Sequence, residues 1–120
     1  MSKLHSTALD IATTYSVDPF VIKYVRSCFY NLKLSRSEMI ERQNNSIREI
    51  HSLATIYERA IEKRQSFIEK YPEDAEHHRN KLLLAQQQLA GLPKNEEKRV
   101  RIKIFLESIS DEEFKKVVQI

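Results

Sequence analysis

Residues 35–71 have the sequence SRSEMIERQNNSIREIHSLATIYERAIEKRQSFIEKY, and their apolar residues predict one long amphipathic helix. Most apolar positions are three or four residues apart, which is the spacing of a coiled-coil seam. Ser35 and Glu38 match a capping box at the start of this helix, and Pro72 is expected to end it. The seam consists of Ile40, Ile47, Ile50, Ala54, Tyr57, Ile61, Ile68 and Tyr71, with a flanking stripe of Met39, Leu53, Ala60 and Phe67.

A second helix is expected to begin at Pro72, since the acidic residues that follow this proline suit a helix N-terminus. Its apolar residues repeat the same spacing as far as Leu92. Gly91 is expected to form a left-handed C-terminal cap, and Pro93 to prevent the helix from continuing. A tight connection at Pro72 then folds both helices into an antiparallel hairpin over residues 35–92.

The second arm of this hairpin is expected to be about half as long as the first, so it covers only the half nearest Pro72. Apolar residues on the other half therefore need a different partner: the N-terminal segment, the C-terminal helices or another chain. Polar residues interrupt the seam in this half at Gln43–Asn45, where they either face water or fix the register of an assembly. The predicted partner-binding residues are Met39, Ile40, Ile47 and Ile50.

The segments on either side of the hairpin are also expected to be helical. Residues 1–34 should form short helices that meet at a turn before Pro19, with Asp18 as N-cap. Residues 93–120 should begin a helix near Asn95 and end in a helix capped by Ser110 and Glu113, although the alternation in residues 100–106 also fits a strand. The fold class expected is all-α, with three consecutive parts: residues 1–34, 35–92 and 93–120.

The composition excludes several classes of protein. With one glycine in 120 residues, the chain has no Gly-rich phosphate loop, dinucleotide-binding fingerprint or nucleophile elbow. Its single cysteine, Cys28, cannot form an internal disulfide, and no metal, cofactor or small-molecule site is indicated. The net charge of +3 is mild, and no signal peptide or membrane span is evident. We therefore expect a soluble, cytoplasmic protein that is not an enzyme.

Residues 8–26 resemble a helix-turn-helix motif, in which Ala12 permits close helix crossing, Val17 is the apolar turn residue, and Ile22 and Val25 anchor the second helix. The segment departs from the motif at Ser16, where glycine usually makes the turn. The resemblance implies that the second helix faces a DNA major groove with Lys23, Tyr24 and Arg26. A basic cluster further along the chain offers additional phosphate contacts from Lys98, Arg99, Arg101 and Lys103.

Two hypotheses of function follow. The first is a non-catalytic interaction or assembly protein that acts through its hairpin, by self-association into a homo-oligomer or by capture of a partner protein. The alternative is a small DNA-binding regulator that uses the helix-turn-helix and oligomerises through the hairpin. The combination of these two elements also resembles the layout of phage small terminase subunits.

Overall fold

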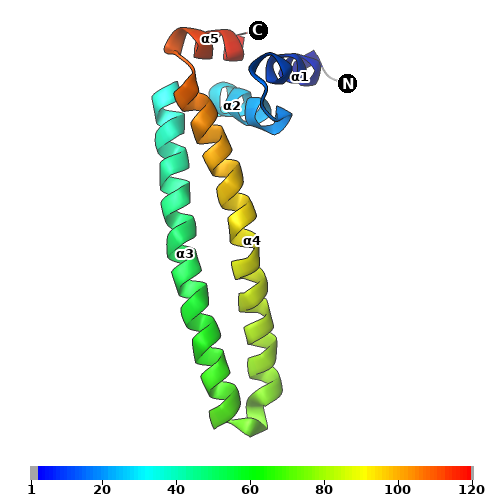
Figure 1. The fold of residues 1–120 in the computed structure, drawn as a ribbon, viewed down its shortest axis with the longest axis vertical. Coiled ribbons are helices and arrows are strands. Elements are labelled where there is room, and N and C mark those ends of the chain that lie inside the picture. Colours follow the sequence, from blue (N-terminus) through cyan, green and yellow to red (C-terminus); the bar gives the residue numbers. More distant parts are fainter. Residues whose placement is uncertain (1–2, 120) are drawn as a thin grey trace. The chain divides into compact units, whose positions relative to one another are not determined.

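The structure, a computed structural model, describes the backbone of residues 3–119 and the side chains of residues 7–119. All regular structure in residues 3–119 is helical, which confirms the all-α prediction. Figure 1 shows the long helices α3 and α4 joined by a short turn, with the shorter helices at the two ends of the chain. The elements are α1 (Lys3–Tyr15), α2 (Pro19–Leu32), α3 (Arg36–Lys70), the 3₁₀ turn η1 (Pro72–Asp74), α4 (Ala75–Ser108) and α5 (Asp111–Gln119).

The predicted end of the second hairpin arm is wrong, because α4 continues through Gly91 and Pro93 to Ser108. Gly91 does not adopt a positive φ, so it forms no left-handed cap. Pro93 removes one backbone hydrogen bond at a cost of about 3 kcal/mol, but both residues are exposed, so water can solvate the freed carbonyl. Continuation is favoured because the last turns of α4 bury large apolar side chains, each worth about 1.5–3 kcal/mol, at Ile102, Phe105 and Leu106.

The two long helices are therefore nearly equal, with 35 residues in α3 and 34 in α4. Residues 100–106 lie inside α4, so the helical alternative is the one that the structure has. The chain divides into two compact units: an end unit, residues 1–45 with 98–120, and a hairpin unit, residues 46–97. This division differs from the three consecutive parts expected from the sequence, since the end unit combines both ends of the chain.

The end unit contains the main hydrophobic core. Helices α1 and α2 pack at the turn that precedes Pro19, and the end of α4 and α5 complete the core. Tyr15 stacks edge-on against Phe105 with ring centroids 5.5 Å apart, which joins α1 to α4. The core consists of Ala8, Ile11, Ala12, Val21, Ile22, Val25, Cys28, Met39, Ile102, Phe105, Leu106, Ile109, Phe114, Val117 and Val118.

Both predicted capping boxes are confirmed. The Ser35 hydroxyl accepts a hydrogen bond from the Glu38 amide (3.2 Å), and the Glu38 carboxylate accepts one from the Ser35 amide (3.0 Å). Ser110 and Glu113 form the same reciprocal pair at the start of α5, over 3.1 and 3.3 Å. These bonds satisfy amide groups that a helix leaves unpaired at its N-terminus.

The hairpin unit consists of the antiparallel parts of α3 and α4 that Figure 1 shows side by side. The register is marked by two cross-helix contacts: Arg64 donates to the His78 ring over 3.0 Å, and the His51 ring contacts the Glu96 carboxylate. Next to the turn, the His78 ring lies 5.1 Å from the Phe67 ring. The only buried hydrophobic residues of this unit are Ile50, Ala75 and Ala85.

Candidate functional site

The four predicted partner-binding residues do not form an exposed stripe, so they offer little surface to another chain. Met39 and Ile50 are buried, and Ile40 and Ile47 are half-buried. Met39 belongs to the core of the end unit, and Ile40 packs against that core. The reason is the continuation of α4 past Pro93, which supplies within one chain the apolar surface that the sequence analysis assigned to a partner.

Gln43, in the polar interruption of the seam, is fully buried and belongs to a hydrogen-bonded network. Its side-chain amide donates to the Tyr24 hydroxyl over 2.9 Å, and Arg99 donates to that hydroxyl over 3.1 Å. Arg99 also donates to the Gln43 side-chain oxygen over 3.3 Å. Of the two alternatives for this interruption, Asn45 faces water, while Gln43 ties α3 to α2 and α4 inside the end unit.

The hairpin unit carries several exposed apolar side chains. Leu53 and Ile56 on α3 are 38% and 56% exposed, and Leu83 and Leu84 on α4 are 54% and 48% exposed. A fully buried leucine or isoleucine is stabilised by about 1.5–3 kcal/mol relative to an exposed one. Several such residues on one small unit therefore indicate a surface that another molecule can cover.

Charge is also absent from the two runs of sequence that contain these side chains. Residues 50–57 and residues 82–93 contain no Asp, Glu, Lys or Arg, in a chain with 31% charged residues. The contacts of His51 with Glu96 and of Arg64 with His78 indicate that the two uncharged runs overlap in part along the antiparallel pair. Residues 54–57 lie opposite about residues 90–93, whereas Leu83 and Leu84 lie opposite the charged residues that follow Tyr57. Depletion of charge is typical of the centre of protein interfaces. We name Leu53, Ile56, Leu83 and Leu84, together with these runs, the uncharged surface.

The apolar spacing predicts that Leu53 belongs to a buried flanking stripe, and it does not single out Ile56, Leu83 or Leu84. The uncharged run in residues 82–93 was the signal that pointed to this surface. Gly91 and Pro93 at the end of this run also match a helix C-terminus, and that interpretation accounts for the run without a binding surface.

The residues predicted to contact DNA have different environments. Lys23 and Lys98 are exposed, but Arg26 is only 3% exposed and donates a 2.7 Å hydrogen bond to the Val117 carbonyl at the end of α5. Tyr24 and Arg99 belong to the Gln43 network. The remaining two cations pair with carboxylates: Arg101 with Asp18, and Lys103 with Glu107 over 3.9 Å.

The turn between α1 and α2 has the backbone of a left-handed turn despite its lack of glycine. Ser16 has φ 56°, and the Val17 amide donates to the Ala12 carbonyl over 3.0 Å. Ala12, Ile22 and Val25 are buried at this corner, as the helix-turn-helix pattern predicts. The geometry of a helical corner is therefore present, whereas Arg26 and Arg99 are directed into the protein.

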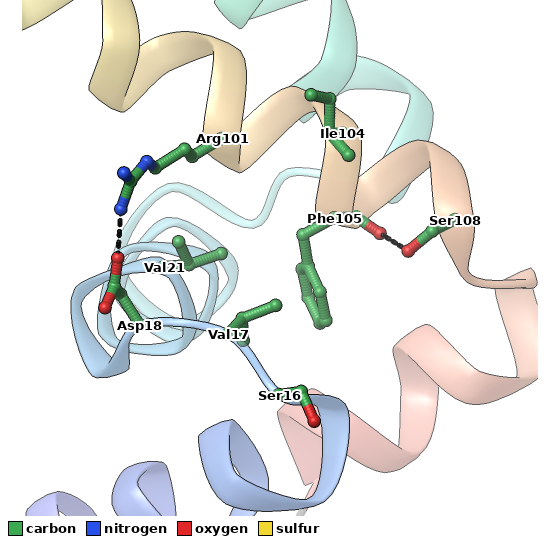
Figure 2. A pocket seen from close by; sticks show the side chains of 8 residues that line it. All are labelled: Ser16, Val17, Asp18, Val21, Arg101, Ile104, Phe105 and Ser108. Atoms are coloured by element: carbon green, nitrogen blue, oxygen red, sulfur yellow. Dashed lines mark hydrogen bonds and ion pairs between the residues drawn. The ribbon is translucent and has the colours of Figure 1, made fainter.

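An open depression of about 430 Å³ lies beside this turn (Figure 2). Val17, Val21 and Phe105 line it with apolar side chains, and the Asp18–Arg101 ion pair spans one side. In residues 7–119 no cluster of three or more His, Cys, Asp or Glu is placed to hold a metal ion.

No helix in residues 3–119 is both long and apolar enough to cross a membrane. Comparison of the chain with protein-family models, curated proteins and solved structures finds no match.

Proposed function

We propose that this chain is a non-catalytic helical assembly protein, which binds another protein surface through the uncharged surface of its hairpin unit. The observation that carries the proposal is the presence of exposed leucine and isoleucine side chains in two uncharged runs that overlap in part. Burial of these side chains against a partner supplies hydrophobic free energy, and the mixed charges that flank the runs supply a polar rim.

The difference in buried apolar side chains between the two compact units supports this proposal. The end unit buries a core of large apolar side chains, so it has its own source of stability. In the hairpin unit Ile50 is the only large side chain that is buried, so additional burial on association stabilises this unit most. A surface of this kind suits a helical partner, because helices pack their ridges into the grooves of other helices.

Site-specific photocrosslinking in cells that produce the chain tests the proposal. A benzophenone amino acid at position 56 or 84 should give protein adducts of defined mass. The same amino acid at Glu58, an exposed residue two positions after Ile56 and therefore on a different face of the helix, should not. Absence of adducts at positions 56 and 84, or equal adducts at all three positions, would show that the uncharged surface is not a binding surface.

A DNA-binding regulator is the second proposal, and the left-handed turn at Ser16 between two packed helices favours it. Exposed Lys23 and Lys98 are the residues that we would assign to phosphate contacts. Double substitution of both lysines by glutamate should abolish binding to duplex DNA and reduce its salt dependence. If the double variant binds duplex DNA with unchanged affinity, this proposal is wrong.

A further inference from the structure

We propose that the partner of the uncharged surface is a second copy of the chain, bound through α3 in an antiparallel dimer centred on Ile56. This inference rests on the assembly function proposed above and specifies its partner. It is carried by one stripe of residues along α3, at alternating intervals of four and three residues: Glu49, Leu53, Ile56, Ala60 and Lys63.

The intervals place this stripe on one face of the helix. The stripe is distinct from the seam that packs against α4, in which Ile50 is buried and Tyr57 and Ile61 are half-buried. Ile56 is more exposed than any other large apolar side chain of the hairpin unit. Glu49 and Lys63, at the two ends of the stripe, are both exposed.

The order of charges along the stripe is self-complementary only for antiparallel helices. Glu49 precedes Ile56 by seven residues and Lys63 follows it by seven, which is about 10 Å in each direction along the helix. A two-fold axis at Ile56 therefore places Glu49 of each copy opposite Lys63 of the other. Parallel helices would instead bring like charges together, Glu49 against Glu49 and Lys63 against Lys63.

The apolar residues of the stripe follow the same symmetry only approximately. Leu53 lies three residues before Ile56 and Ala60 four residues after it, so the antiparallel arrangement sets the large Leu53 of one copy level with Arg59 of the other and next to its small Ala60. Large side chains opposite small ones allow helices to interdigitate. The stripe is only about 21 Å long, which is short for an interface of about 800 Å² per partner, so we expect a reversible dimer that dissociates on dilution.

Sedimentation velocity of the purified chain over a wide range of concentrations tests the dimer. Ile56→Glu should raise the dissociation constant at least tenfold. The matched control is Ile104→Glu, which changes an isoleucine of similar exposure in the end unit and should leave the constant unchanged. Both substituted residues are exposed, and circular dichroism confirms that each variant is folded. An equal effect of the two substitutions would overturn the proposal.

Charge reversal tests the antiparallel arrangement. Glu49→Lys alone and Lys63→Glu alone should each weaken the dimer several-fold, and the double variant should recover wild-type association. If the double variant is as weak as either single variant, the predicted pairing of Glu49 with Lys63 is wrong.

Cysteine crosslinking gives an independent measurement of the axis. In a Cys28→Ser background, Ile56→Cys should form an intermolecular disulfide, because a disulfide requires Cα atoms within about 7 Å of each other. Glu49→Cys and Lys63→Cys should each remain uncrosslinked alone and should crosslink when mixed. Disulfides within each of the three single variants would indicate a parallel dimer and overturn the proposal.

The two proposals can fail separately. A purified chain that stays monomeric at every concentration overturns the dimer. If position 56 then still crosslinks to a different protein in cells, the assembly function stands with another partner. If positions 56 and 84 give no adduct either, both proposals are overturned.

Discussion

The buried side-chain amide of Gln43 in α3 donates a 2.9 Å hydrogen bond to the hydroxyl of Tyr24 in α2. Arg99 donates to the same hydroxyl over 3.1 Å, so one oxygen atom joins three helices of the end unit. A buried donor that loses its acceptor keeps its full desolvation cost, so this bond matters more for stability than an exposed one.

Tyr24→Phe should therefore lower the free energy of unfolding by about 1–3 kcal/mol, because it removes an acceptor from two donors. Urea denaturation followed by circular dichroism measures this change. Tyr71→Phe is the control, since Tyr71 is exposed and its ring contact with Phe67 is retained; it should change stability by less than about 0.5 kcal/mol. Equal values for the two variants would show that the network contributes nothing.

Gly91→Ala should raise the free energy of unfolding by about 0.5–1 kcal/mol, since Gly91 lies inside α4 and no atom lies within 4 Å of an added Cβ. Ala90→Gly, at the neighbouring exposed position, should lower it by a similar amount. Thermal or urea denaturation gives both values. If Gly91 were instead a left-handed helix cap, alanine would destabilise the chain, so the sign of the change tests the continuity of α4.

Arg26→Met should lower the free energy of unfolding by about 1.5–3 kcal/mol, because the Arg26 guanidinium donates to the Val117 carbonyl at the end of α5. Lys23→Met, on the exposed face of the same helix, should change it by less than about 0.5 kcal/mol. Chemical denaturation separates the two variants. A negligible effect at Arg26 would mean that its buried hydrogen bond is not required for the core.

Glu38 makes the free energy of unfolding of the chain depend on pH. The Ser35 amide and hydroxyl hydrogen-bond to its carboxylate and lower the pKa of Glu38 below its ordinary value. Because the folded pKa is the lower one, the contribution of Glu38 is complete above the unfolded-state pKa and is lost as the pH falls through the folded pKa.

Glu38→Gln should accordingly reduce the loss of stability between about pH 5 and pH 3, the range below the ordinary pKa of a glutamate. Denaturant midpoints measured at several pH values check this effect. Glu41→Gln, at an exposed position of the same helix, should leave the pH profile unchanged. Identical profiles for wild type and Glu38→Gln would contradict the capping role of the carboxylate.

Local patterns predicted much of this fold. The capping boxes at Ser35 and Ser110 and the turn before Pro19 depend on neighbouring residues, and each appears where its pattern predicts. The end of the second arm was mispredicted because Gly91 and Pro93 are local stop signals. Their combined cost is outweighed by the burial of Ile102, Phe105 and Leu106, which depends on residues far away in the sequence.

The sequence by itself determined the helical class, the antiparallel hairpin and the starts of α2, α3 and α5, since the period of apolar residues and the capping side chains act within a few residues. Only the tertiary structure decided which apolar residues remain exposed. Met39 is buried and Ile56 is not, although both lie on α3, because exposure depends on which other helices pack against each position. The same packing directs Arg26 toward α5 and leaves Lys23 in water, a difference that helical spacing alone does not reveal.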